Sequence, residues 1–401
     1  MLKGKTIVLA VSGSIAAYKI ANLARMCKKQ GADVHVLMTP NSVNFINPIT
    51  LETLTENKCL IDTFDRNFQY SVEHVALAKK ADVVMIAPAS ANVIGKLANG
   101  IADDMLTTTV MACPCKKIIS PAMNHNMFHN PIVQENINKL AYYGYEIVVP
   151  DTGMLANGDI GDGRMPSEKI LLSYILKECA FEKDLFGESI LVTAGATREP
   201  LDPVRFITNH SSGKMGYAIA ENAMLRGAGV TLISAHADIA PPPFVQVVNV
   251  NTAQEMYDEV LKFFDDCTIA VKAAAVADYR PVNISDNKIK KSDGRLTVEF
   301  ERTPDILAEL GKRKGNRFLC GFSMETENML ENSRKKLENK NLDMIVANNL
   351  KTPGAGFGVD TNIVSIITKE NVKELERMSK QDVAAAIFDE ILKMKNKGTS
   401  Y

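Results

Sequence analysis

Residues 5–14 read KTIVLAVSGS and residues 189–197 read SILVTAGAT, so twice in this chain an apolar run leads into a glycine turn. A helix is expected after each turn, in the second case opening at the segment SSGKMG, residues 211–216. Each expected helix is followed by another apolar run, GADVHVLM at 31–38 and GAGVTLIS at 227–234. A short apolar run before a glycine turn is typical of a strand buried on both faces of a parallel sheet. Glycine lets the backbone approach a ligand, and a helix N-terminus offers free N–H groups to an anion. The sequence therefore predicts two domains that each bind a nucleotide or a phosphate.

The rest of the chain continues this alternation of apolar runs and helical segments. It predicts an α/β fold with two doubly wound, Rossmann-like domains that bind ligands at the carboxyl ends of their strands. Neither glycine turn reads G-x-G-x-x-G, so an ordinary dinucleotide site is not predicted. The boundary is expected near residues 179–188, CAFEKDLFGE, which gives domains 1–180 and 188–401. The further expected strands are 83–87, 117–120 and 146–149 in the first domain, and 245–250, 268–271 and 344–347 in the second.

The composition is that of an ordinary globular protein and narrows the choice of partners. Apolar residues make up 46% of the 401 positions, and the net charge of −1 gives no reason to expect nucleic acid as a partner. No apolar stretch approaches the length of a membrane span, and residues 1–4 leave no room for a signal peptide before the first strand. Seven cysteines at uneven spacing are typical of reduced thiols rather than a disulfide framework or a zinc site. We therefore expect a cytoplasmic protein.

Small polar residues follow two further strands of the first domain. Residues 88–96 read PASANVIGK, and residues 121–127 read PAMNHNM. Either motif alone is read as a turn whose Ser or Asn caps the next helix. Together with the turn GSIAAYK at 13–19, the three segments resemble the FMN-dependent cysteine decarboxylases, a family with a flavodoxin-like fold and the signature PAMN-x-x-M. The resemblance covers about residues 5–165.

The resemblance implies a flavin site and a substrate site. His74 matches the family's catalytic histidine, and an imidazole suits proton transfer near neutral pH. A lone histidine is more often structural, but the residues around His74 and its distance from PAS match the family. The other histidines receive only structural roles. Asn124 is also implied in catalysis, and Asn124, Met127 and Arg164 are implied to contact substrate. The implied FMN contacts are Gly13, Ser14, Ile15, Thr39, Ser90, Asn92 and Ala122.

The second domain carries a longer series of phrases in a fixed order. They are AGATREPLDPVRFITNHSSGKMG from 194, AAAVADYRP from 273, KIKK from 288, TPDIL from 303, and KKLENKNLD from 335. Alone, KIKK is a solvated charge run and ADYRP an ordinary exit from a strand. Together they resemble the phosphopantothenate–cysteine ligases. In that family CTP activates the carboxylate of 4′-phosphopantothenate as an acyl-cytidylate, and the amine of cysteine then displaces CMP. Cations against the phosphates and a divalent metal, Mg²⁺ with CTP, fit this chemistry, with metal ligands left unknown.

The ligase resemblance also assigns individual residues. Asn209 matches the residue that supports the acyl-cytidylate, and Lys288 matches a catalytic lysine. The helix opening at 211–216 is implied to receive a phosphate. The implied CTP contacts are Asp278, Lys288, the backbone of Pro304, Asp305, Ile306 and Leu307, then Phe322, Lys336 and Lys340.

The two resemblances in this order imply a bifunctional enzyme of coenzyme A biosynthesis. The ligase product, 4′-phosphopantothenoylcysteine, is the substrate of the decarboxylase half. That family oxidises the thiol carbon with FMN to a thioaldehyde, loses carbon dioxide to give an enethiol, and reduces this to 4′-phosphopantetheine. The resemblance also implies homo-oligomers, with trimers through the flavin domain and dimers through the ligase domain.

One position departs from the family. The family carries a cysteine in the segment A-C-G-x-x-G-x-G-R and uses it as a proton donor, but residues 156–164 here read ANGDIGDGR, with Asn157 at that position. An amide cannot supply a proton at neutral pH, whereas a thiol with a pKa of about 8.5 can. The change is natural with another donor, such as Asp159 or water, or it is engineered, or it leaves a half that only oxidises. A flavin-binding interaction module beside an active ligase is the alternative from another class.

Overall fold

The computed structural model describes residues 1–63, 73–154, 158, 160–291, 295–325, 328–349 and 360–398. The chain forms two compact units, Met1–Glu182 and Lys183–Tyr401. The second unit begins before residue 188, because Asp184 pairs with Arg226 at 2.5 Å and the N–H of Leu185 donates to the carbonyl of Arg226 at 3.1 Å. Among the described residues, no helix has both the length and the apolar character needed to cross a bilayer.

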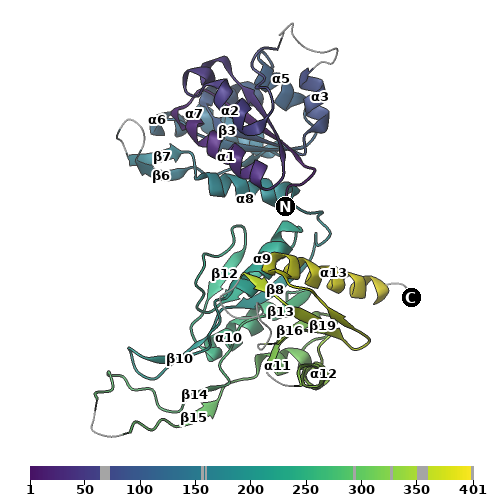
Figure 1. Cartoon of the computed structure of the whole chain (residues 1–401). Coiled ribbons are helices and arrows are strands. Elements are labelled where there is room, and N and C mark those ends of the chain that lie inside the picture. Colours follow the sequence, from purple (N-terminus) through teal and green to yellow (C-terminus); the bar gives the residue numbers. More distant parts are fainter. Residues whose placement is uncertain are drawn as a thin grey trace. The chain divides into compact units, whose positions relative to one another are not determined.

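The first unit is built around a central sheet (Figure 1). Its strands are parallel and have the order β2-β1-β3-β4-β5. Every residue of β1 and β3 is buried, as expected for strands covered on both faces. This is the flavodoxin-like order. Successive strands are added to one side of β1 and then to the other, so the strand order reverses between β1 and β3 and leaves a ligand crevice there. The strands are β1 Thr6–Val11, β2 Asp33–Met38, β3 Val83–Ala89, β4 Lys116–Pro121 and β5 Glu146–Ile147.

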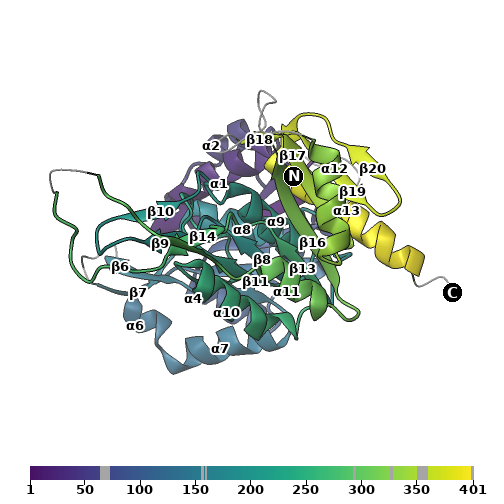
Figure 2. The same cartoon turned by 90° about the horizontal axis from the view of Figure 1, so that it is seen from below.

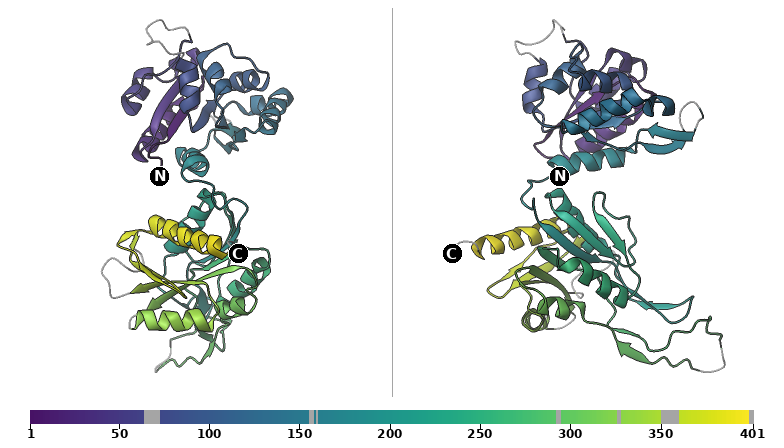
Figure 3. Two further views of the ribbon diagram at one scale, coloured as in Figure 1. Left: turned by 90° about the vertical axis from the view of Figure 1, so that its right-hand side faces the viewer. Right: turned by 180° about the vertical axis from the view of Figure 1, so that it is seen from behind.

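Helices cover both faces of this sheet (Figure 3). Residues Ile7 and Leu9 of β1 pack with α1 Tyr18–Lys29, α2 Pro48–Thr55 and α8 Glu168–Cys179. Val8 and Ala10, which alternate with them, face the other layer. That layer consists of α3 Glu73–Lys80, α4 Ala91–Ala98, α5 Met105–Ala112 and α7 Pro131–Tyr142. The smaller elements are η1 Ile15–Ala17, η2 Pro40–Asn44, α6 His125–Phe128, and the hairpin of β6 Asp151–Met154 and β7 Ile160–Arg164.

The second unit contains an eight-stranded sheet with the order β12-β11-β8-β13-β16-β17-β19-β20, which has β20 at its edge (Figure 2). Its first six strands are parallel and follow the Rossmann order 3-2-1-4-5-6, whereas β19 and β20 are antiparallel additions. The predicted fold class is confirmed. The strands are β8 Ser189–Ala194, β11 Gly229–Ser234, β12 Gln246–Asn249, β13 Ile269–Lys272, β16 Phe318–Glu325, β17 Met344–Asn349, β19 Val364–Thr368 and β20 Val372–Glu374.

The helices of the second unit again form two layers (Figure 1). One layer packs on a shared core and consists of α10 Ala253–Phe264, α11 Ile306–Lys312 and α12 Met329–Asn339. The other consists of α9 Lys214–Leu225 and α13 Lys380–Gly398. Two pairs of short antiparallel strands extend from the sheet (Figure 1). They are β9 Arg198–Pro200 with β10 Phe206–Thr208, and β14 Tyr279–Pro281 with β15 Phe300–Arg302. A further antiparallel pair consists of β18 Thr361–Asn362 and β21 Met378–Ser379, which β19 and β20 separate in the sequence.

Candidate functional site

In the first unit, Ser12 joins the carboxyl ends of the two strands at the reversal point. Its hydroxyl donates to the carbonyl of Pro88 at 2.7 Å and accepts the N–H of Ser90 at 2.9 Å. The loop after β1 and the loop after β3 are therefore held side by side. The sheet order predicts a ligand crevice at this edge.

Two cavities open at this edge of the sheet, and consecutive residues line them. Ser14, Ile15 and Ala122 line a cavity of about 610 Å³, together with Asn124 and Arg164. The second cavity, of about 470 Å³, is lined by the other predicted flavin contacts, Gly13, Thr39, Ser90 and Asn92, and by Met127. The structure thus places all ten predicted residues of these two groups around one edge of the sheet.

The simpler reading of the two polar motifs, as helix caps, also holds. The hydroxyl of Ser90 accepts the N–H of Val93 at 3.5 Å, and the amide oxygen of Asn124 accepts the N–H of Asn126 at 2.9 Å. Capping uses one acceptor of each side chain. It leaves the amide NH₂ of Asn124 and the hydroxyl hydrogen of Ser90 for a ligand.

The residues of both cavities fit FMN. The hydroxyl oxygen of Thr39 is buried and has no hydrogen-bond partner among the described residues, which costs free energy until a ligand supplies one. Ala122 is buried and small, so a planar ring system can approach the backbone there. Lys19 and Arg164 add two cations to the larger cavity, where burial and then the charge of Arg164 lower the pKa of Lys19. Sequence reasoning missed Lys19, although it stands in the motif GSIAAYK.

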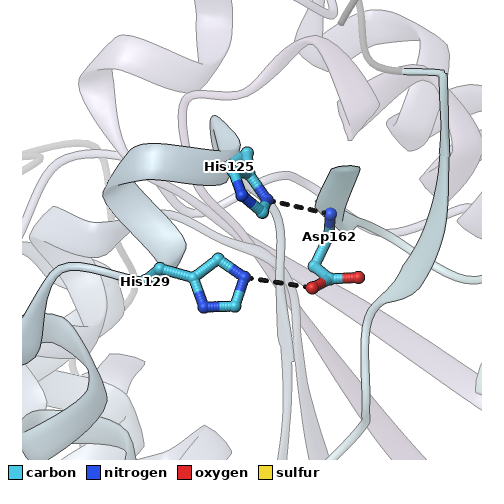
Figure 4. Close-up of side chains that lie close together, drawn as sticks. All are labelled: His125, His129 and Asp162. Atoms are coloured by element: carbon cyan, nitrogen blue, oxygen red, sulfur yellow. Dashed lines mark hydrogen bonds and ion pairs between the residues drawn. The ribbon is translucent and has the colours of Figure 1, made fainter. Parts of the chain in front are cut away.

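The hairpin β6–β7 is tied to the loop after β4. The N–H of Met123 donates to the carbonyl of Gly163 at 3.1 Å. Figure 4 shows a second connection, in which His129, directly after α6, pairs with Asp162 on β7 at 3.0 Å while the ring of His125 accepts the backbone N–H of Asp162. Hydrogen bonds from Thr152 and His129 lower the pKa of Asp162. His125 and His129, both predicted to be structural, therefore hold the β6–β7 hairpin in place. Gly163 and Arg164 of that hairpin line the larger cavity.

His125, His129 and Asp162 also lie close enough together to offer three ligands to a metal ion. However, Nδ1 of His125 accepts the backbone N–H of Asp162 at 3.1 Å, so the neutral ring carries its hydrogen on Nε2. That ring has no free lone pair for a metal in this arrangement. We therefore assign the three side chains to the fastening of the hairpin.

Gly163→Ala is expected to lower the decarboxylase kcat/KM by about 5- to 150-fold, because an added Cβ would lie 2.4 Å from the carbonyl oxygen of Met123 in a backbone with φ of +113°. The measurement is product formation from supplied 4′-phosphopantothenoylcysteine. Gly144→Ala is the matched control, since Gly144 has φ of +87° and nothing within 4 Å of the added atom. Equal rates in the two variants would contradict the role given to this contact.

One described residue predicted for the first unit, His74, is not brought to the cavities. His74 lies partly buried on α3 and lines neither cavity among the described residues. Asn157 and the alternative donor Asp159 lie outside the described residues. The roles of His74 and Asn157 stay predictions.

In the second unit, a cavity of about 150 Å³ lies at the carboxyl ends of β13, β16 and β17. Residues 211–215 at the N-terminus of α9 form one wall, and Phe322 with Asn348 forms another. The amide oxygen of Asn348 is buried and has no hydrogen-bond partner in the part of the chain that the structure describes. Free N–H groups of the helix and an unsatisfied buried amide both suit a polar ligand with an anionic group.

Gly195, just after β8, and Gly216, in α9, both lie very close to other parts of the protein. Gly195 has φ of +80°, and an added Cβ there would lie 2.5 Å from the carbonyl oxygen of His236. At Gly216 the added atom would lie 2.5 Å from the Cβ of Ala194. Close approach to a ligand is thus not the only reason for these glycines.

Most of the predicted nucleotide contacts lie on or directly beside α11, α12 and β16. Asp305 caps α11 and pairs with Lys340 at 2.8 Å, and Lys336 pairs with Glu325 at 2.7 Å, close to Phe322 on β16. Although burial raises the pKa of Asp305, its hydrogen bonds from Lys340 and the N–H of Ala308 lower it overall. Pro304 is partly buried, while the side chains of Ile306 and Leu307 belong to the core, so only their backbone can meet a ligand.

None of the remaining predicted ligase residues lines the cavity at the N-terminus of α9, although Asn209 lies at its edge. Asp278 and Lys288 are both exposed. Asp278 directly precedes β14, and Lys288 lies in the long segment between β14 and β15. Asn209 is exposed as well, and its amide donates to the carbonyl of Ala275, a residue that lines the cavity, at 3.2 Å. The structure therefore brings Asn209 to the cavity edge and leaves Lys288 on an extended arm.

Comparison with known proteins identifies both units. Residues 1–180 match the family described as Flavoprotein, and residues 185–394 match the DNA/pantothenate metabolism flavoprotein C-terminal domain. The coenzyme A biosynthesis bifunctional protein CoaBC of Bacillus subtilis (strain 168) is 45% identical over 395 residues, or 98% of this chain and 97% of that protein. A cysteine/cysteine sulfinic acid decarboxylase from an unknown prokaryotic organism is 44% identical over 354 residues, or 86% of this chain and 99% of that protein. The crystal structure of a C-terminal domain of CoaBC is 43% identical, covers 53% of this chain and 97% of its own, and has a TM-score of 0.46.

The chain is thus a two-domain α/β enzyme that joins a flavoprotein domain to a domain of pantothenate metabolism. It belongs to the family of coenzyme A biosynthesis bifunctional proteins, CoaBC, which combine a decarboxylase with a ligase. The family and enzyme class predicted from the sequence are confirmed.

Proposed function

We propose that the C-terminal unit ligates 4′-phosphopantothenate with cysteine at the expense of CTP and Mg²⁺. The N-terminal unit then decarboxylates 4′-phosphopantothenoylcysteine to 4′-phosphopantetheine with FMN. Both reactions use small polar metabolites, and we propose the cytoplasm as their location. Homo-oligomers, trimeric through the flavin unit and dimeric through the ligase unit, are part of the same proposal.

The observation that carries the proposal for the first unit is the gathering of all the expected flavin contacts around the β1–β3 reversal point. FMN bound there would take up a hydride from the substrate carbon and later return it. The chain's own groups have other tasks. The cations Lys19 and Arg164 attract the anionic substrate, the amide of Asn124 orients it, and the hairpin bearing Gly163 covers it.

For the second unit, the cavity at the N-terminus of α9 supports a phosphate-bearing substrate. The lysines near Asp305 and Glu325 provide positive charge for a nucleotide. The carbonyl of Ala275 holds Asn209 beside this cavity, in a position to donate a hydrogen bond to an acyl group. The ligands of the proposed Mg²⁺ are not assigned.

The proposal is tested by supplying the purified full-length protein with 4′-phosphopantothenate, cysteine, CTP and Mg²⁺ and identifying products by mass spectrometry. Pyrophosphate release should require the two organic substrates CTP and 4′-phosphopantothenate together with Mg²⁺. Replacement of CTP by ATP should abolish most of it. A reaction with cysteine as the only substrate tests for the decarboxylation of cysteine, the activity named for the cysteine/cysteine sulfinic acid decarboxylase. A yellow protein that releases pyrophosphate but forms no decarboxylated product would favour the alternative, a flavin-binding interaction module beside an active ligase.

His74→Asn is expected to retain FMN but to show no bleaching of the flavin absorbance when substrate is added without oxygen. The reason is that His74 is proposed as the base for oxidation of the substrate thiol. His74 does not line the cavities of its own chain in the described structure, so we propose that a neighbouring copy in the trimer supplies it. Reassembly of His74→Asn chains with Asn124→Ala chains should then restore part of the activity. Bleaching at an unchanged rate in His74→Asn would make this histidine structural.

A further inference from the structure

A lysine ends a buried central strand of the second unit. In β13 the residues Ile269, Ala270 and Val271 are buried, and Lys272 follows them at the carboxyl end. Lys272 lies opposite Thr193 of β8 on one side and Gly321 of β16 on the other. Lys272 itself is partly buried, and partial burial of a charged side chain is costly unless a partner compensates its loss of hydration.

The surroundings of Lys272 contain charges of both signs. Two carboxylates on neighbouring elements, Asp305 and Glu325, form ion pairs with lysines other than Lys272. Lys272 shares its strand face with Ala270, which packs in the same core as α11 and α12. On those helices Asp305 pairs with Lys340, and Lys336 pairs with Glu325. Within the part of the chain that the structure describes, the Lys272 side chain makes no hydrogen bond or ion pair.

The electrostatic consequence is a lysine whose charge is poorly compensated. Burial, and after it the charge of Lys340, lower the pKa of Lys272 from 10.5 to about 8, with Lys336 acting in the same direction. Asp305 and the exposed Asp278 oppose this shift. An anion bound beside the ammonium group would remove the deficit. The next three residues, Ala273 to Ala275, line the cavity at the N-terminus of α9.

We propose that Lys272 is a substrate-binding residue of the ligase that pairs with a phosphate group of one of its substrates. This inference rests on the proposed function. Lysine binds phosphate as a compact charge with three donors, and it is effective where water is partly excluded. The triphosphate of CTP is the favoured source of this phosphate, because Asp305, Lys336 and Lys340 are the expected nucleotide contacts. The phosphate of 4′-phosphopantothenate is the other source of the same chemistry.

The test compares Lys272→Met and Lys272→Arg in the full-length protein with Lys335→Met as control. Lys335 lies on the same helix as Lys336 but is exposed and pairs with Glu331. Lys272→Met should raise the KM for CTP by about 10- to 100-fold and change kcat far less, as for the loss of a charged hydrogen bond. Lys272→Arg should restore most of the affinity, and Lys335→Met should resemble the unmodified protein. A rise in the KM for 4′-phosphopantothenate alone would assign the other phosphate.

The pH dependence gives a readout that a purely structural lysine would not change. In the unmodified protein kcat/KM for CTP should fall as the pH rises through about 8, because Lys272 loses its proton in the free enzyme. Lys272→Arg should stay flat to about pH 10, since a guanidinium keeps its proton. Lys272→Met should also lack this fall, at a low kcat/KM throughout.

Calorimetric titration with CTP and Mg²⁺ separates this inference from the proposed function. Decarboxylation of supplied 4′-phosphopantothenoylcysteine should be unchanged in Lys272→Met, which shows that the chain still folds. CTP binding that depends on Lys272 in a protein without ligase activity would sustain the inference and refute the function. An unchanged Kd for CTP, an unchanged KM for both phosphorylated substrates and an unchanged pH profile in Lys272→Met would overturn the inference.

Discussion

Lys288→Gln is expected to lower the rate of CTP-dependent pyrophosphate release by about 10²- to 10⁴-fold, the range for one lost electrostatic contact with a transition state. Negative charge builds up on the α-phosphate of CTP when the carboxylate of 4′-phosphopantothenate attacks it. A glutamine of similar length keeps a hydrogen-bond donor but carries no charge, so the loss should fall mainly on kcat. Rapid-quench measurement of pyrophosphate in the first turnover follows this step directly.

The structure explains why this variant should fold normally and supplies its control. Lys288 is exposed and makes no ion pair among the described residues. Its neighbour Ile289 is fixed through the backbone, since its N–H donates to Asp202 at 3.1 Å and its carbonyl accepts from Arg205 at 3.0 Å. Lys290→Gln, two residues away and also exposed, should leave the rate within about twofold. Near-normal pyrophosphate release from Lys288→Gln would make the assignment wrong.

Local patterns were sufficient to predict the central sheets. The runs at β1, β3 and β8 are continuous and apolar because helices cover both faces, and a glycine turn follows β1 and β8. The predicted flavin contacts Ser14 and Ser90 lie in the loops just after β1 and β3. Antiparallel β19 and β20 were not predicted, since a strand added at a sheet edge leaves no distinct signal in its own sequence.

Contacts between distant segments were less predictable. Nothing local shows that Asp162 pairs with His129, or that Lys288 lies on an arm while Lys340 lies beside Asp305. These placements depend on the packing of whole elements. Lys272 did have a local signal, because a charge that ends an apolar strand before AAAVADYRP lies at the ligand edge of a parallel sheet.

Under anaerobic conditions, the unmodified protein is expected to release carbon dioxide from 4′-phosphopantothenoylcysteine for about one turnover. It should then retain the enethiol product. This expectation rests on Asn157, at the position of the family's cysteine. The oxidative half of the reaction does not need that thiol. The reductive half needs a proton at carbon, and a neutral amide has none to give at neutral pH. The residue lies outside the described residues, between strands that are tied to the cavity through Gly163 and Asp162.

Asn157→Cys should therefore form 4′-phosphopantetheine over many turnovers, since a thiol with a pKa of about 8.5 can donate a proton near neutral pH. Asn157→Ser is the matched control, because a hydroxyl of similar size does not titrate there. Mass spectrometry of an anaerobic reaction separates the outcomes, since the enethiol has two hydrogens fewer than the saturated thiol. Rapid formation of the saturated product by the unmodified chain would refute the expectation. The donor would then be Asp159, Asp162 or an ordered water, and single Asp→Asn replacements at these two positions would identify it.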